Sequence, residues 1–162
     1  MELFKKKKGN MDYTIIIGCG RLGANLANTL SDEDGNVLVI DKDKDAFRKL
    51  SPSFGGLTMT GDATDFDVLN EAQMSRAGVV VAVTNNDNIN IMTAQIVREL
   101  FKIQRVIARL YDPDRECVYR ELAIDTICPA VLSAQEIDKI LSQTARTDDE
   151  NCSEQISKEA IK

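Results

Sequence analysis

Short apolar runs alternate with segments of helical periodicity along most of the chain. The apolar runs are predicted to be strands, and they lie at residues 13–17, 36–40, 57–60, 79–83, 105–109 and 124–128. The run Val79–Val83 is apolar at every position, as expected of a strand covered on both faces. Strict alternation of strands and helices with short connections predicts an α/β fold, a doubly wound, six-stranded, mostly parallel sheet with helices on both faces.

Helical periodicity also predicts which side chains face the sheet. The helix that begins near residue 21 and the long helix after residue 88 each carry an apolar stripe, and the helix after residue 133 carries an apolar edge. The residues expected on the inner faces of the first two helices are Leu22, Leu26 and Leu30, then Met92, Ile96, Val97 and Leu100, and the apolar edge of the last helix consists of Ile137, Ile140 and Leu141.

The first strand runs into a glycine-rich turn that opens a helix. The turn reads Gly18-Cys19-Gly20-Arg21-Leu22-Gly23, a G-x-G-x-x-G pattern. We expect its first glycine to make a tight bend, the second to let the backbone approach a phosphate, and the third to let the helix pack on its strand. The helix start would offer unpaired N–H groups to an anion, and the Arg21 guanidinium could pair with phosphate oxygens.

Polar residues stand where the other strands end. Asp41 follows Gly23 by eighteen residues, where a carboxylate can accept both hydroxyls of an adenosine ribose. Corresponding positions, at the end of a later strand or just after it, are held by Asp62, Thr84, Asn85, Asn86 and Arg109. Since the carboxyl ends of parallel strands share one edge, we expect a Rossmann-like ligand site there. Taken singly, Asp62, Asn85 and Asn86 fit a helix cap or a loop equally well.

Composition narrows the function classes. The chain has 162 residues and a net charge of −6, which argues against a nucleic-acid partner. Its four cysteines show no C-x-x-C spacing and it contains no histidine, so we expect reduced thiols and no ordinary zinc site. The apolar runs are too short to span a bilayer, and the first residues do not form an apolar signal region. These features favour a cytoplasmic protein.

We divide the chain into three parts. Residues 1–10 form a basic arm, residues 11–142 form the Rossmann-like domain, and residues 143–162 form a polar tail with too little apolar content for another folded unit.

Five runs of the sequence form a combination more specific than the glycine motif alone. They are Ile15 to Gly23, Val39-Ile40-Asp41-Lys42-Asp43, Gly61-Asp62-Ala63-Thr64-Asp65, Val83 to Asn90, and Val106 to Pro113. In these runs the chain resembles the nucleotide-binding N-terminal domain of TrkA/KtrA proteins, also called KTN or RCK domains, which are regulatory subunits of potassium channels and transporters. The resemblance covers about residues 11–142.

The resemblance implies an adenine nucleotide, NAD(H) or ATP, ADP or AMP, held at the carboxyl edge of the sheet. The glycine turn would take the phosphates with Arg21 reaching the outer ones, Asp41 would take the ribose, and Asp62 and Ala63 would border the adenine. The cofactor-binding residues expected on this basis are Gly18, Cys19, Gly20, Arg21, Leu22, Gly23, Asp41, Lys42, Asp62, Ala63, Thr84, Asn85, Asn86 and Arg109.

The same resemblance implies partners. Family members form homodimers that assemble into a ring beneath a membrane potassium channel or transporter subunit, on the inner face of the cell membrane. Nucleotide binding would then change the shape of the ring and bias gating. The smaller C-terminal lobe of full-length family members has no counterpart in this sequence.

Two other functions stay open. An NAD-dependent oxidoreductase would fit the glycine turn and Asp41, but it requires an acid or base at the nicotinamide. The chain has no histidine, and none of Tyr13, Tyr111 and Tyr119 has a lysine four residues on. A nucleotide sensor for a partner other than a potassium pore would use the same site. We therefore expect a regulator and not an enzyme.

Overall fold

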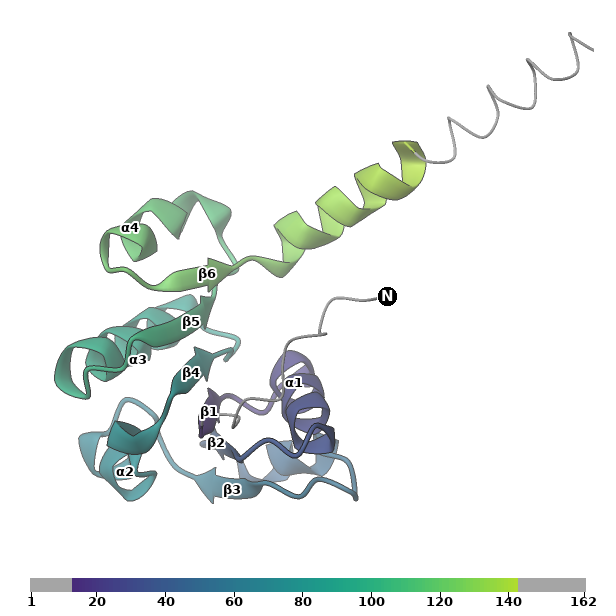
Figure 1. Cartoon of the computed structure of the whole chain (residues 1–162). Helices are drawn as coiled ribbons and strands as arrows, with labels where there is room; N and C mark the ends of the chain where they lie inside the picture. Colours follow the sequence, from purple (N-terminus) through teal and green to yellow (C-terminus); the bar gives the residue numbers. More distant parts are fainter. Residues whose placement is uncertain (1–12, 143–162) are drawn as a thin grey trace, which may run out of the picture. The chain divides into compact units, whose positions relative to one another are not determined.

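The computed structural model describes residues 13–142 of the chain (Figure 1). The chain divides into two compact units, Met1–Ile127 and Cys128–Lys162. The basic arm expected at 1–10 and the polar tail expected at 143–162 lie outside the described residues, so these limits stay predictions. In the second unit, the described part is helical over residues 129–142.

The first unit is built on a six-stranded sheet in which every pair of neighbouring strands is parallel. The strand order is β3-β2-β1-β4-β5-β6, so the chain leaves β1 toward one edge of the sheet and then crosses to the other side at β4. This order confirms the doubly wound α/β prediction. The strands are β1 (Thr14–Ile17), β2 (Val37–Asp41), β3 (Leu57–Thr60), β4 (Val79–Ala82), β5 (Arg105–Arg109) and β6 (Asp125–Ile127).

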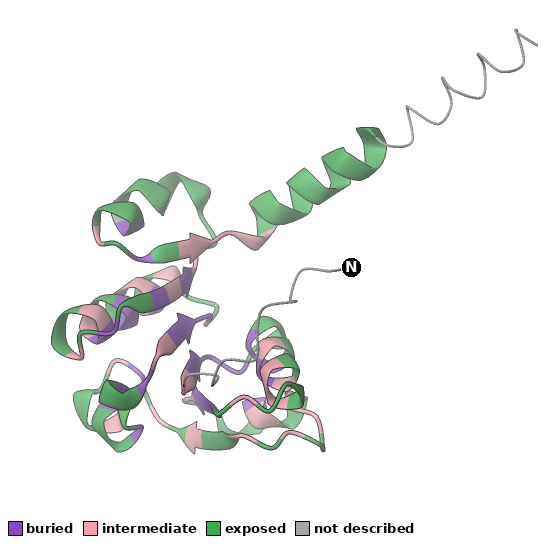
Figure 2. Ribbon diagram, in the orientation of Figure 1, coloured by how far each residue is buried: buried purple, intermediate pink, exposed green. Residues whose placement is uncertain are grey.

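Helices cover both faces of the sheet (Figure 1). They are α1 (Arg21–Asp32), η1 (Lys44–Lys49), α2 (Phe66–Glu71), η2 (Met74–Arg76), α3 (Asp87–Leu100), η3 (Pro113–Arg115) and α4 (Glu116–Glu121). Successive strand residues point to opposite faces and enter two separate cores. Ile16 and Val39 belong to the core under α1 and η1, whereas Ile15 and Leu38 belong to the core under α2 and α3. Figure 2 shows the central strands as the most buried part of the molecule.

The inner face of α1 is not the leucine stripe that periodicity predicts. Gly23, Ala24 and Ala27 are the buried residues of this helix, and Leu22 is 37% exposed. The reason is the close approach of the helix to the sheet, since small side chains occupy the row nearest the strands. Leu26 and Leu30 pack beside that row and are only partly buried.

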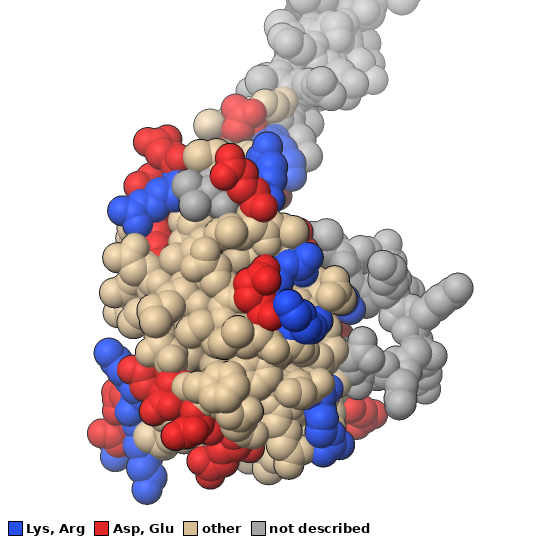
Figure 3. Space-filling view, turned by 90° about the vertical axis from the view of Figure 1, so that its left-hand side faces the viewer, with Lys and Arg blue, Asp and Glu red and all other residues tan. Residues whose placement is uncertain are grey.

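The buried face of α3 also differs from the one that periodicity predicts. Asn90, Thr93, Ala94 and Val97 are its buried residues. Of the apolar side chains expected inside, only Val97 is fully buried, while Met92 is 50% and Leu100 62% exposed. Figure 3 shows the side of the molecule that carries α2, α3 and α4, and its middle is mostly uncharged.

The apolar edge expected on the helix at residues 129–142 is exposed. Ile137, Ile140 and Leu141 are 58%, 56% and 65% exposed. Within residues 13–142, none of the helices combines the length and the hydropathy that a membrane span requires.

Candidate functional site

The sheet has its switch point between β1 and β4. The two strands are hydrogen-bonded neighbours, and their following loops leave in opposite directions, toward α1 and toward α3. Loops that part in this way leave a crevice at the carboxyl edge of an open α/β sheet, which is where such folds bind ligands. The backbone N–H of Gly18 donates to Ile40 and that of Val83 donates to Ile17, both at 2.8 Å, so both loops start from fixed positions.

Two glycines of the turn are required by the fold. Gly18 has φ +102°, and a Cβ there would lie 2.9 Å from the backbone nitrogen of Thr84. A Cβ on Gly23 would lie 1.9 Å from the carbonyl oxygen of Gly18, so only glycine lets α1 begin this close to β1. The bend and the helix packing expected of these two residues are both present.

Gly20 is different, because nothing lies within 4 Å of the position where its Cβ would stand. It is the N-cap of α1, and no side chain caps the helix there. The first-turn N–H groups of a helix have no partner within the helix, and they carry the positive end of its dipole. This geometry leaves room for an anion to approach the backbone, as expected of the second glycine.

Asp41 is bonded to the glycine turn. Its Oδ2 accepts the backbone N–H of Cys19 at 2.6 Å, and its Oδ1 accepts that of Asp43 at 2.9 Å. A carboxylate has about four acceptor positions, so each oxygen retains one for a ligand hydroxyl. The side chain of Cys19 is fully buried, and burial together with the neighbouring Asp41 charge raises the pKa of its thiol.

The loop after β3 joins the same edge. The backbone N–H of Gly61 donates to the carbonyl oxygen of Asp41 at 3.0 Å. Asp62 accepts both the N–H and the hydroxyl of Thr64, at 2.9 and 2.7 Å. These two hydrogen bonds lower the pKa of the Asp62 carboxyl, and the positive charge of Lys42 lowers it further. Ala63 is 6% exposed and belongs to the core, which limits the part of it that a ligand could contact.

The loop after β4 contains Asn86, which could be a helix cap or a loop residue on the sequence alone. The side chain of Asn86 accepts the backbone N–H groups of Asn88 and Ile89, at 2.9 and 3.2 Å, and so caps α3. Asn85 is exposed beside it. The structure thus gives Asn86 a structural role, while its contact with a ligand stays a prediction.

Arg109 ends β5 at the same edge. Its guanidinium carbon lies 5.5 Å from the ring centroid of Tyr111, within cation–π distance. Its Nε is buried and has no hydrogen-bond partner in the described structure. A buried donor of this kind costs free energy unless an acceptor reaches it, which is consistent with a ligand or partner oxygen at this position.

Comparison with known families decides where the chain belongs. A family model described as the TrkA-N domain matches residues 14–130, which include every strand of the sheet. The chain belongs to the TrkA-N domain family. This membership confirms the family resemblance found in the sequence.

Two curated relatives carry potassium-uptake names. This TrkA-N domain is 42% identical over 125 residues to the Trk system potassium uptake protein TrkA of Streptomyces coelicolor, covering 77% of this chain and 56% of that protein. It is 33% identical over 132 residues to a TrkA homolog of Methanothermobacter thermautotrophicus, covering 81% of this chain and 61% of that protein. The chain therefore spans less than two thirds of either relative.

Solved structures share the fold of this TrkA-N domain. The TrkA-N domain of the Escherichia coli inner membrane protein ybaL aligns with a TM-score of 0.72 at 19% identity, over 81% of this chain and 97% of that one. The AMP-bound Kef CTD of Shewanella denitrificans gives 0.69 at 19% identity, over 81% and 80%. GsuK bound to ADP gives 0.61 at 20% identity, over 73% and 31%.

One residue that organises the site of this TrkA-N domain was not predicted as part of it. Asn90 is fully buried in α3, and its Oδ1 accepts the N–H and the hydroxyl of Thr84, at 2.9 and 2.6 Å. Its amide nitrogen donates to the carbonyl oxygens of Thr84 and Arg109, at 3.2 and 3.0 Å. Asn90 therefore ties the end of β4 to the end of β5. The sequence signal that could have identified it is the T-x-x-D-x-x-N spacing of Thr84, Asp87 and Asn90, within the run Val83 to Asn90.

Asp87 has a related role one turn earlier. Its carboxylate accepts the backbone N–H groups of Tyr111 and Asp112, at distances of 2.9 to 3.2 Å. Its backbone carbonyl accepts the hydroxyl of Tyr119 at 3.0 Å. The start of α3 is thereby fixed to the loop after β5 and to α4. The aspartate and asparagine of this run hold loops in place.

Proposed function

We propose that this TrkA-N domain binds an adenine nucleotide at the carboxyl edge of its sheet. The observation that carries the proposal is the open approach to the backbone at Gly20, next to the Asp41 carboxylate at the end of β2. A phosphate at the helix start and a ribose at the aspartate are parts of one nucleotide, and both fit the switch point.

In the proposed complex, the turn Gly18–Gly23, including Cys19 and Leu22, surrounds the phosphates. The exposed guanidinium of Arg21 lies in the first turn of α1, from which it can reach the outer phosphates. Asp41 accepts the ribose hydroxyls with Lys42 beside it, and Asp62 and Ala63 border the adenine. Thr84, Asn85 and Asn86 line the floor, and Arg109 reaches a phosphate.

The proposal covers NAD(H), ATP, ADP and AMP, because they share the ribose that Asp41 would recognise. Two structural neighbours, GsuK and the Kef CTD, are described as bound to ADP and AMP, which supports this ligand class.

We further propose that the domain is a cytoplasmic regulatory subunit of a potassium channel or transporter. The Trk names of the two relatives support this partner. The domain would act as a homodimer that assembles into a ring on the inner face of the membrane. Regulation requires that the nucleotide binds two states of the ring with different affinity, since equal binding would shift nothing.

Two alternatives use the same site. A nucleotide sensor with a partner other than a potassium pore would need no change in the residues named above. An NAD-dependent oxidoreductase would need an acid or base for hydride transfer, and the absence of histidine leaves this reading with less support. We therefore propose a regulator without enzymatic activity.

The test is a calorimetric titration of the nucleotide-stripped protein with NADH, NAD, ATP, ADP and AMP in turn, with light scattering for assembly. Binding without turnover, accompanied by a change in oligomer size, is the expected result. Tight NAD binding by an unchanging monomer would favour the oxidoreductase, and no binding of any of the five would refute the nucleotide site.

A further inference from the structure

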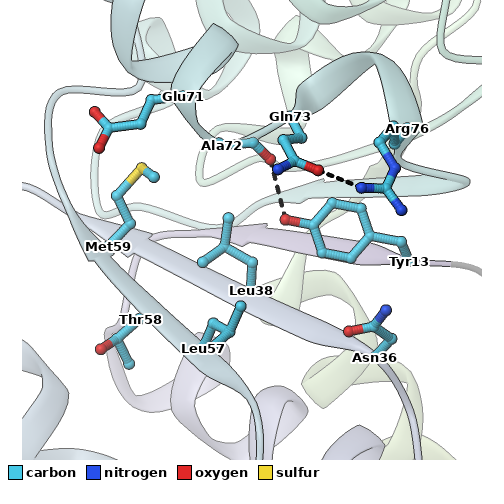
Figure 4. A pocket seen from close by; sticks show the side chains of 10 residues that line it. All are labelled: Tyr13, Asn36, Leu38, Leu57, Thr58, Met59, Glu71, Ala72, Gln73 and Arg76. Carbon is cyan, nitrogen blue, oxygen red and sulfur yellow. Dashed lines mark hydrogen bonds between the residues drawn. The ribbon is translucent and has the colours of Figure 1, made fainter.

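A second pocket lies at the opposite edge of the sheet. It has a volume of about 310 Å³ and is lined chiefly by Tyr13, Leu38, Leu57, Met59, Gln73 and Arg76 (Figure 4). Tyr13 immediately precedes β1, and Leu57 begins β3. Leu38, the β2 residue that lines this amino-edge pocket, belongs to the core under α2 and α3 and precedes Asp41 by three residues, about 10 Å along the strand.

The pocket lies over β2 and β3, where the helical cover on this face is the short α2, while the longer α3 contacts β4 and β5. The opposite face carries α1, which has 12 residues, whereas α2 has only six and is followed by the three-residue η2. The floor of the pocket is apolar, formed by Leu38 of β2 and Met59 of the edge strand β3. Leu57 begins that strand and remains 66% exposed. An apolar body placed here would cover surface that the fold itself leaves in water.

One end of the pocket is polar and positively charged. The hydroxyl of Tyr13 donates to the carbonyl oxygen of Ala72 at 3.0 Å, and a guanidinium nitrogen of Arg76 donates to the side chain of Gln73. In Figure 4 the Arg76 guanidinium and the Asn36 amide lie on the same side of the pocket, above and below the Tyr13 ring. Among residues 13–142, no carboxylate forms an ion pair with Arg76. Its charge is therefore not neutralised by the described part of the protein.

The opposite end carries a negative charge. Figure 4 shows Glu71 beside Met59, across the pocket from Arg76 and Asn36. A ligand with one carboxylate can direct it toward Arg76 and extend its apolar part over Leu38. A second carboxylate would approach Glu71 and be repelled.

We propose that the amino-edge pocket binds a small monocarboxylate with an apolar body, with the carboxylate at Arg76 and Asn36 and the body over Leu38, Leu57 and Met59. The volume is at the lower end of the range for small-molecule sites, which suits a ligand of about ten non-hydrogen atoms. A ligand of this size in a half-open pocket should bind with a Kd on the order of 1 mM.

The test uses octanoate as the probe and NMR spectra of the full chain as the readout. We expect saturable shifts of the Met59 methyl signal and of the backbone signals of Tyr13 and Leu57, with none at Gly20. Octylammonium has the same tail and the opposite charge, so it should bind much more weakly. Saturation with equal affinity for both probes, no saturation, or shifts centred on Gly20 would each overturn the proposal.

Variants test the polar end separately. Arg76 is exposed, so Arg76→Gln should leave the fold intact and weaken octanoate about fivefold. Arg48→Gln removes another exposed arginine, in η1 on the opposite face, and should leave octanoate binding unchanged. Equal effects of the two substitutions would refute a role for Arg76.

The amino-edge site does not depend on the proposed nucleotide site. Octanoate binding is measured without nucleotide, and ADP binding is measured without octanoate. Either can fail while the other succeeds, so the two outcomes are distinguishable.

Discussion

Replacing Gly23 and Gly20 with alanine separates what the fold requires from what a ligand requires. In Gly23→Ala the new Cβ would stand 1.9 Å from the carbonyl oxygen of Gly18. Carbon–oxygen contacts in proteins are about 3.3 Å or longer, so α1 and the turn must move apart by more than about 1 Å. The obstacle is backbone and cannot rotate away, as a flexible side chain could.

The expected cost follows from two opposing effects. Overpacking a well-packed site costs up to about 3 kcal/mol, while alanine in a helix gains about 1 kcal/mol over glycine. We therefore expect Gly23→Ala to lower the free energy of unfolding by about 2 kcal/mol. For a domain of this size that corresponds to a decrease in Tm of about 8 °C.

Gly20→Ala is the matched control. Its Cβ would meet nothing within 4 Å, and the residue has φ −75° and ψ −172°, which alanine adopts without strain. We expect a change in stability below about 1 kcal/mol. If the phosphate assignment is correct, this variant should nevertheless bind ADP at least tenfold more weakly, because the methyl group would occupy the approach to the backbone.

Thermal unfolding followed by circular dichroism and ADP calorimetry measure the two effects. A Gly23→Ala protein that melts at the wild-type temperature would refute the packing argument. A Gly20→Ala protein that binds ADP as tightly as the wild type would remove the phosphate from this turn while leaving the fold argument untouched.

Substitutions at four further positions are informative. Asp41→Ala should weaken every adenosine ligand by a similar factor in calorimetry, and unchanged affinities would contradict the ribose assignment. Arg21→Ala should weaken ATP more than AMP, whereas equal losses would remove Arg21 from the outer phosphates. Asn90→Ala leaves buried groups without partners and should lower stability to urea by about 3 kcal/mol; a loss below about 1 kcal/mol would refute its bracing role. Thr64→Val removes a hydroxyl donor and should raise the pKa of Asp62 in an NMR titration, whereas Thr64→Ser should preserve it.

The Asp62 prediction has a definite sign. Its pKa is lowered in the folded protein, so the ionised carboxylate stabilises the fold above the pKa of the unfolded chain. That contribution is lost as the pH falls through the folded-state pKa. Thr64→Val should therefore reduce stability at neutral pH and have little effect in strong acid.

The sheet was predictable because its signals are local. The strands at 57–60 and 105–109 have the bounds that their apolar runs predict, and the glycine turn has the conformations that its spacing implies. The helix faces were less predictable. Periodicity ranks side chains by hydrophobicity, but the row of α1 nearest the sheet is selected by size and contains Ala24 and Ala27. Whether size or hydrophobicity selects the buried residues depends on how closely the helix approaches the strands, and the sequence does not give that distance.

The role of Asn90 was missed for a different reason. A polar residue in a helix is usually assigned to the solvent face, and nothing local shows that α3 begins beside the end of β5. Once these elements are adjacent, a single amide bonds the backbone of Thr84 and the carbonyl of Arg109 together. A displacement of either loop must then move the other or break these bonds. The loops after β4 and β5, which both contain proposed ligand contacts, are therefore expected to move together. The hydrogen bonds of Asp87 also connect them to the backbone at Tyr111 and Asp112.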